Sequence, residues 1–281
     1  MSDTGFIGIL LIIANVAFSY KGFTNQFFFN KYNFEVEKIL IYKDYKRLVT
    51  SGFLHLNWMH LIFNMLALYF FSGPVEEYLG PIQFLLIYFI SLAGGNLFSL
   101  YIHKHQSEYG AVGASGAICG IIFASIALFP GMRIGLFLLP LSIPGWLFGL
   151  AYVAYSIYGI KSRRTNSGHD AHLAGALIGM LVALLFKPSA FAANYFTILV
   201  ITVPTIAFIY IIVTRPHILL IDNGFSRKKK NYYSIDHKVN EEKANYEKEI
   251  DNILDKISKH GMSSLSSREK AMLKEYSQSV K

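Results

Sequence analysis

Long apolar stretches separated by short polar connections dominate the first three quarters of the chain. Seven stretches lack Asp, Glu, Lys and Arg, and they occupy residues 4–20, 48–75, 78–103, 109–132, 134–160, 171–186 and 188–214. A helix needs about 20 apolar residues to cross the hydrocarbon of a bilayer, and only structures that satisfy their own backbone polar groups survive there. The pattern therefore predicts an all-α polytopic membrane protein with seven spanning helices.

Local signals adjust the ends of these helices. The segment from Leu54 to Met59 is too polar for lipid, so a loop is expected before the second helix. Proline suits the first turn of a helix and disrupts its interior, so the fifth helix should start near Pro144. Residues 21–47 form a long connection rich in aromatic side chains, a composition typical of the membrane–water boundary.

The last quarter of the chain has a different character. Residues 215–281 carry 14 basic and 10 acidic side chains, whereas residues 1–214 carry 12 and 8. We therefore divide the chain into a membrane core (1–190), an additional spanning helix (191–214) and a C-terminal tail (215–281). The tail opens with a basic linker, whose cluster at 227–230 suits anionic lipid headgroups.

Two short helices are predicted within the tail. Apolar residues with helical spacing lie within 239–259, and Gly261 is placed to end that helix. Ser266 and Glu269 then form a capping-box pattern that opens a second helix. No catalytic residue types cluster here, so we expect a small helical appendage for docking or stability.

Composition excludes several classes of protein. Hydrophobic residues make up 53% of the chain and charged residues 16%, against about 25% charged in soluble domains. This excludes a simple soluble enzyme and a disordered chain. The net charge of +8 is shared by body and tail, which argues against nucleic-acid binding and suits a lipid bilayer. The single cysteine, Cys119, excludes an internal disulfide and a Cys-based zinc cluster, and we expect no metal and no cofactor.

Uncharged polar side chains inside the apolar body are costly there and usually mark function. His60 and Asn64 are four residues apart, so they share one face of the second helix. Ser115 opens the fourth span, where free backbone N–H groups favour negative charge, and His172 opens the sixth. Taken singly, each group has a structural alternative: the polar pair can hydrogen-bond helices together, and a membrane serine often serves packing.

Glycine spacing connects these groups. Gly175 and Gly179 follow His172 as a small-xxx-small face that could mate with Gly116 and Gly120 of the fourth helix. Such a contact would bring Ser115 and His172 together. A nucleophilic serine needs a base within hydrogen-bond reach and donors aimed at the oxyanion, and His60, Asn64 and the serine N–H could supply the donors. His169 and Asp170 are second candidates for base and orienter, but we expect them to face water.

In this order, the residues strongly resemble the rhomboid family of intramembrane serine proteases. The resemblance runs from Lys46-Arg47 to Gly179, and it includes His55, His60, Asn64, Gly113-Ala114-Ser115-Gly116, Ala171-His172 and Gly175. It implies a compact six-helix bundle of the bacterial type, with a short central fourth helix. The extra helix makes this chain similar to the six-plus-one form.

The resemblance also implies an activity. Ser115 would be the nucleophile and His172 the general base of a dyad, while His60 and Asn64 would bind the oxyanion. Substrates would be single-spanning membrane proteins with a locally unstable helix, cut through an acyl-enzyme. The fifth helix, through Trp146 and Phe148, resembles a lateral gate. A multi-pass location follows, in the plasma or inner membrane of a bacterium.

Several alternatives stay open. The chain has Cys119 where some family members place a tyrosine that stacks on the catalytic histidine, so that role is vacant or supplied elsewhere. The competing function is a catalytically inactive relative that binds membrane proteins. A metalloprotease would need His-Glu-x-x-His, which is absent. Lys and Arg in the connections on the Ser115 side favour a cytoplasmic site by the positive-inside rule, whereas most bacterial family members open outward.

Overall fold

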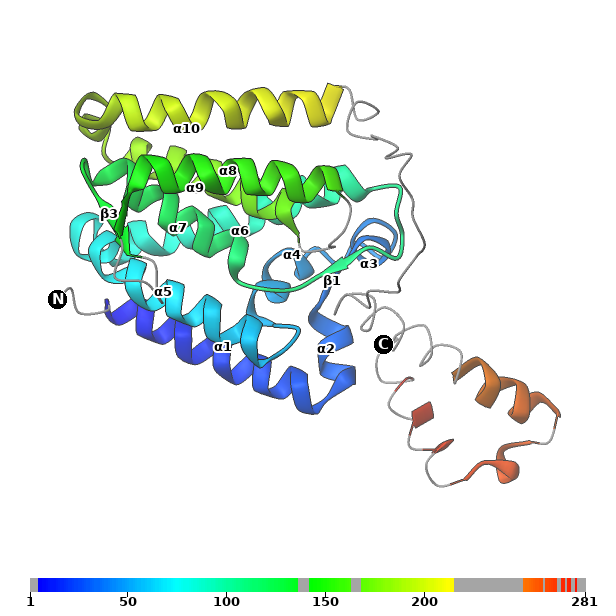
Figure 1. Cartoon of the computed structure of the whole chain (residues 1–281). Coiled ribbons are helices and arrows are strands. Elements are labelled where there is room, and N and C mark those ends of the chain that lie inside the picture. The colour runs from blue at the N-terminus through cyan, green and yellow to red at the C-terminus, as the bar shows by residue number, and fades with distance from the viewer. Residues whose placement is uncertain are drawn as a thin grey trace.

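Seven helices form the body of the part of the chain that the structure describes (Figure 1). The computed structural model describes residues 5–135, 142–162 and 168–214, and in the tail 250–259, 261–266, 269–270, 272–273 and 276. The body helices are α1 (Phe6–Thr24), α5 (Trp58–Leu79), α6 (Pro81–His103), α7 (Ser115–Leu128), α8 (Gly145–Ser162), α9 (His169–Phe186) and α10 (Ser189–Thr214). The predicted all-α polytopic fold is confirmed, and the fifth helix begins directly after Pro144.

Five of these helices are long and apolar enough to cross a membrane by length and composition, namely α1, α5, α6, α9 and α10. The other two, α7 and α8, are shorter apolar helices. The 14 residues of α7 span about 21 Å, less than the ~30 Å of bilayer hydrocarbon. Only one end of α7 can therefore reach a membrane surface.

The long connection between α1 and α5 is more ordered than its composition indicates. It contains α2 (Gln26–Tyr32), β1 (Phe34–Glu35), α3 (Val36–Leu40), α4 (Arg47–Thr50) and the 3-10 turn η1 (Ser51–Phe53). Strand β1 pairs antiparallel with β2 (Gly110–Ala111), which ties this connection to the segment leading into α7. A second antiparallel pair, β3 (Arg133–Gly135) and β4 (Ser142–Pro144), leads into α8.

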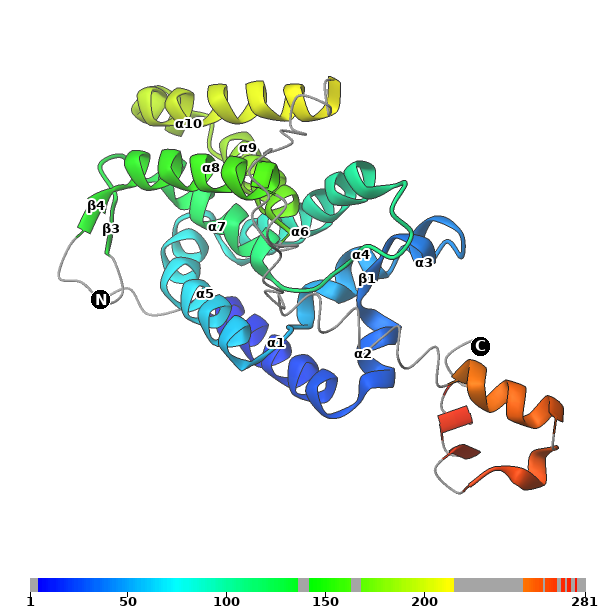
Figure 2. The same cartoon turned by 45° about the vertical axis from the view of Figure 1, so that its right-hand side comes forward.

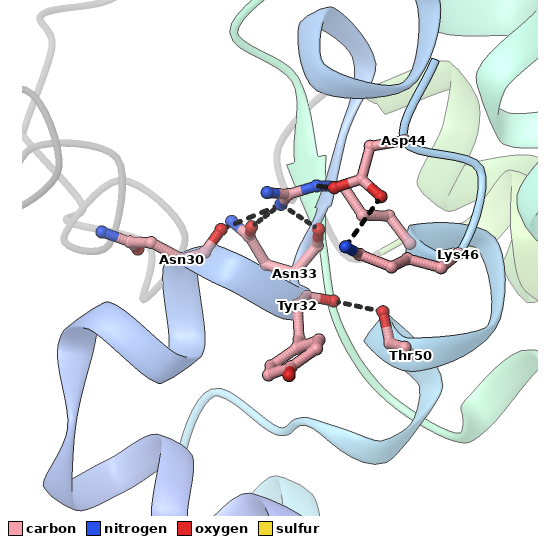
Figure 3. Close-up of polar contacts among 7 residues, drawn as sticks. Asn30, Tyr32, Asn33, Asp44, Lys46 and Thr50 are labelled. Atoms are coloured by element: carbon pink, nitrogen blue, oxygen red, sulfur yellow. Dashed lines mark hydrogen bonds and ion pairs between the residues drawn. The ribbon is translucent and has the colours of Figure 1, made fainter. Parts of the chain in front are cut away.

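A buried arginine holds this connection together (Figure 3). Arg47 is 6% exposed, and its Nη1 donates to the carbonyls of Asn30 and Asn33 at 2.9 and 2.8 Å and to the Asn33 side chain at 2.8 Å. Its Nε donates to Asp44 at 2.9 Å, and Lys46 lies 3.4 Å from the same carboxylate. A buried charge is tolerable only when paired and hydrogen-bonded in this way.

The centre of the bundle is α7, which Figures 1 and 2 show enclosed by α5, α6, α8 and α9. After Ser115, every residue of this helix except Ile122 is buried. A helix that is apolar all round belongs inside a core. This position explains why α7 needs no lipid-facing surface of its own.

Glycines let α7 and α9 touch backbone to backbone. A Cβ on Gly175 would overlap the backbone of Gly116, and one on Gly179 would overlap that of Gly120. The small-residue face predicted between these helices is confirmed. On the neighbouring α6, a Cβ on Gly95 would lie 2.6 Å from the carbonyl oxygen of Ala171, so three helices converge closely around the start of α9.

The far end of the bundle has a charged anchor of its own. The Glu76 carboxylate, on α5, accepts hydrogen bonds from the backbone N–H groups of Ile7 and Gly8, each at 3.0 Å. A carboxylate at the N-terminus of α1 is favoured by the helix dipole.

The tail contains the predicted helical signals. Residues 250–259 are helical, and the N–H of Gly261 donates to the carbonyl of Ile257 at 2.8 Å. Ser266 and Glu269 form the capping box, since the Ser266 N–H donates to the carboxylate at 2.6 Å. Ile250, Ile253 and Leu265 pack together as a small apolar cluster within the tail. The basic cluster at 227–230 and residues 239–249 lie outside the described residues, and the domain boundaries stay a prediction.

Candidate active site

The segment before α7 sets the position of Ser115. Gly113 has a φ of +134°, which favours glycine, and its N–H donates to the carbonyl of Ser51 at 3.0 Å. A Cβ at this position would lie 2.8 Å from Cε1 of His60, so glycine also permits a close approach to α5. Ser115 is then the first residue of α7, where N–H groups lack intrahelical partners.

The structure brings Ser115 and His172 together across the glycine interface. The Oγ of Ser115 lies 2.5 Å from Nε2 of His172, within hydrogen-bond reach. Both side chains are half-buried, so the pair is sheltered yet reachable. Gly168, with a φ of +61°, precedes the first turn of α9, which carries the histidine. Without the contact of Gly175 on Gly116, these two helix starts could not approach so closely.

His60 and Asn64 lie one turn apart on α5, and the ring of His60 lies against Gly113, two residues before Ser115. Asn57 caps the helix by accepting a hydrogen bond from the N–H of His60 at 2.9 Å. Asn64 is 7% exposed, and its Nδ2 has no hydrogen-bond partner among the described residues. A buried amide donor without a partner costs free energy, so it is expected to meet an acceptor that the resting protein does not supply.

Behind His60 lies a second histidine, His55, in the loop before α5. Its Nδ1 lies 2.8 Å from the Ser19 hydroxyl of α1, and its ring meets that of His60 edge-on at 4.9 Å. Burial, and then the nearby His60, lower the pKa of His55 to about 3, so this side chain is neutral at physiological pH. We interpret it as a support that fixes His60.

Cys119, four residues after the serine, is contacted by a tyrosine of another helix. The Cys119 thiol lies 2.9 Å from the Tyr152 hydroxyl of α8, and Phe148 stacks on Tyr152 with ring centroids 6.3 Å apart. Trp146, at the start of α8, packs edge-on against Phe196 of α10. These contacts describe how α8 is held; they leave its role as a gate a prediction.

His169 is an aromatic neighbour of His172, and the two rings meet edge-on at 6.0 Å. His169 also packs against Tyr155 at 5.0 Å, and a Cβ on Gly159 would overlap its ring. His169 and Asp170 are 6% and 5% exposed, so the expectation that they face water is wrong. They are buried because α8 covers one and the end of α6 covers the other.

This arrangement suits acyl transfer. It combines a hydroxyl hydrogen-bonded to an imidazole with a buried amide donor and the free N–H groups of a helix start. Within the described part of the chain, no three His, Cys, Asp or Glu side chains cluster closely enough to hold a metal ion.

The family model for the rhomboid domain matches residues 42–189, more than half of the chain. The chain therefore belongs to the rhomboid family, as a polytopic membrane protein. A second family model, described only as a family of unknown function, matches residues 233–279 in the tail.

Individual relatives agree with this assignment. Rhomboid protein 1, mitochondrial, of Saccharomyces cerevisiae is 35% identical over 150 residues, covering 51% of this chain and 43% of its own. Rhomboid-like protein 11, chloroplastic, of Arabidopsis thaliana is 35% identical over 153 residues, covering 50% and 53%. Rhomboid protease AarA of Providencia stuartii is 30% identical over 161 residues, covering 51% and 56%. The chain thus spans about half the length of the curated relatives it matches.

Proposed function

We propose that this protein is an intramembrane serine endopeptidase that uses a Ser115–His172 dyad. The observation that carries the proposal is the 2.5 Å contact between Oγ of Ser115 and Nε2 of His172. Family membership supports the activity at a coarser level, since the relative from Providencia stuartii is named a rhomboid protease.

The proposed reaction has two halves. Ser115 Oγ attacks the carbonyl carbon of the scissile peptide bond and passes its proton to Nε2 of His172. His60, Asn64 and the N–H of Ser115 stabilise the oxyanion of the tetrahedral intermediate. When the C–N bond breaks, His172 returns the proton to the leaving amine, and an acyl ester remains on Ser115. Water then attacks the ester with His172 as base, which releases the acid and restores the hydroxyl.

The substrates we propose are single-spanning membrane proteins. A half-buried site among apolar helices suits a peptide that arrives through lipid. For a spanning helix, exposing a peptide bond means losing backbone hydrogen bonds, which is costly in hydrocarbon, so a locally unstable helix should be preferred. If the source is bacterial, the plasma or inner membrane is the proposed location.

Covalent labelling tests the nucleophile without a known substrate. The purified full chain in detergent micelles is treated with a fluorescent fluorophosphonate, which reacts with activated serine hydroxyls. The parent should be labelled, and Ser115→Ala and His172→Ala should lose the label. Ser125→Ala is the matched control, because this buried serine lies on the same helix and its hydroxyl donates to the carbonyl of Ile121.

Cleavage of a spanning substrate in proteoliposomes tests the reaction itself. Ser115→Ala should reduce the rate by at least about 10⁴, with the thermal unfolding temperature unchanged. Labelling of the Ser115→Ala protein at the parent rate would contradict the proposal. A folded parent that neither labels nor cleaves would favour the inactive membrane-protein-binding relative instead.

A further inference from the structure

A buried serine of α1 contacts the loop that leads into α5. Ser19 is fully buried, and its Oγ donates a hydrogen bond to the carbonyl of Phe53 at 2.9 Å. The same Oγ lies 2.8 Å from Nδ1 of His55. One side chain of α1 therefore joins the end of the turn η1 to the histidine that precedes α5.

The number of available protons fixes the direction of these hydrogen bonds. A serine hydroxyl has one proton, and a carbonyl oxygen can only accept. The proton of Ser19 is used on Phe53, so Ser19 accepts the second hydrogen bond from the Nδ1–H of His55. A neutral imidazole carries a single N–H, which leaves Nε2 of His55 without a proton. Ser19 thus fixes both the position and the tautomer of His55.

The ring of His55 in turn supports His60. His55 is fully buried, and the two rings meet edge-on with centroids 4.9 Å apart and planes at 72°. A Cβ on Gly113 would lie 2.8 Å from Cε1 and 3.0 Å from Nε2 of His60, so this edge of the ring faces the segment that carries Ser115. His60 is therefore in contact both with His55 and with the backbone before the serine.

The turn η1 also holds that backbone. The N–H of Gly113 donates to the carbonyl of Ser51 at 3.0 Å, and Ser51 and Phe53 are the two ends of η1. A closed cycle of contacts results, whose members are Ser19, His55, His60, Gly113 and η1. Because a packed interior leaves few voids, a displacement of one member is felt by its neighbours. The hydroxyl of Ser19 is the point where α1 joins this cycle.

We propose that Ser19 is a positioning residue that holds His60 in place as an oxyanion donor, through His55 and through η1 with Gly113. The proposal rests on the proposed function, because it assigns Ser19 a role in binding the oxyanion. Donors stabilise that charge only when they are held at hydrogen-bond distance before the charge develops. A misplacement of about 1 Å can cost on the order of 10² in rate, so the support of a donor affects catalysis.

Cleavage kinetics of the full chain in proteoliposomes test this role. Ser19→Ala removes the hydroxyl with little change of volume. We expect kcat to fall about tenfold with KM unchanged, since the oxyanion forms only after the substrate is bound. Ser72→Ala is the matched control, because this serine of α5 is also fully buried and its Oγ has no partner among the described residues. The control should leave both constants unchanged.

A double-mutant cycle separates positioning of His60 from general support of the fold. If Ser19 acts through His60, Ser19→Ala should slow a His60→Ala protein by less than about twofold, because the group it positions is already gone. An equal fall in kcat in both backgrounds would overturn the inference, since Ser19 would then act independently of His60.

Side-chain nitrogen NMR spectra test the direction of the hydrogen bonds. The full chain, carrying isotope-labelled histidine, is measured in micelles, and the resonances that disappear in His55→Gln belong to His55. We expect a protonated Nδ1 and a bare Nε2 in the parent, and loss of this preference in Ser19→Ala. A protonated Nε2 and a bare Nδ1 in the parent would overturn the inference.

The outcomes are distinct from those of the proposed function. If the parent is not labelled by fluorophosphonate at Ser115, the proposed function fails. If the parent is labelled and Ser19→Ala cleaves with the parental kcat, only the inference is overturned. If thermal unfolding shows that Ser19→Ala does not fold, the tautomer of His55 in the parent still decides.

Discussion

Two polar clusters inside this apolar protein differ in how their hydrogen bonds are used. Around Arg47, the Nε and Nη1 groups have acceptors, and the carboxylate of Asp44 has two cations beside it. Around Ser115, the amide of Asn64 and Nδ1 of His60 lack partners among the described residues. Among the described residues, the first cluster is paired, whereas the second keeps polar groups without a partner.

The difference distinguishes polar groups that stabilise the fold from polar groups that are available for a reaction. A completed network stabilises the fold that contains it, and removing one member leaves buried charge behind. An open network weakens the resting fold, and its donors are satisfied only when an acceptor arrives. Substitutions in the first cluster should therefore lower the unfolding free energy, and substitutions in the second should lower the reaction rate.

Breaking the complete cluster should have the largest effect. Arg47→Ala leaves Asp44 and two carbonyls without their donor, and we expect a loss of about 3–5 kcal/mol of unfolding free energy. Denaturant titration in micelles measures it. Lys46→Ala is the control, because its side chain is 55% exposed and should contribute at most about 1 kcal/mol. Equal losses in the two variants would contradict this assignment.

Breaking the open cluster should change the rate instead. Asn64→Ala removes an oxyanion donor, and we expect cleavage to slow by about 10²–10³, with unfolding free energy unchanged or higher. Asn96→Ala provides the contrast, because that amide donates to the carbonyl of Leu48 at 2.8 Å and should cost stability. A destabilised but fully active Asn64→Ala protein would reverse the comparison.

The capping box of the tail is a third polar arrangement. Its groups are hydrogen-bonded but exposed to water, so breaking it should have the smallest effect. Hydrogen bonds from Lys256 and then Ser266 lower the pKa of Glu269 to about 2, from 4.5. The carboxylate therefore stabilises the tail above pH 4.5, and this support is lost as the pH falls toward 2. The amide resonance of Ser266 should titrate near pH 2 in the parent and not at all in Glu269→Gln. A midpoint near 4.5 in the parent would show that the capping box does not form.

Much of this architecture follows from sequence. Stretches without charge locate the helices, because the cost of charge in hydrocarbon is large compared with local preferences. Spaced glycines predict the α7–α9 contact, since small side chains set how closely backbones approach. The juxtaposition of Ser115 and His172 follows from that contact.

Other features depend on tertiary contacts that one sequence does not reveal. His169 and Asp170 come directly after a polar connection, so they are predicted to face water. Their burial depends on α8 and on the end of α6, which lie close in space but far along the chain. The contact between Cys119 and Tyr152 likewise joins residues 33 positions apart, with no periodic signal.

The short length of α7 has a consequence for how the proposed reaction is supplied. Hydrolysis needs two reactants of opposite solubility, a spanning peptide that diffuses in the plane of the membrane and water that comes from one compartment. Because Ser115 is the first residue of a helix too short to cross, the two routes would meet at its beginning. The side on which that end opens would decide which compartment provides the water and which receives the soluble product.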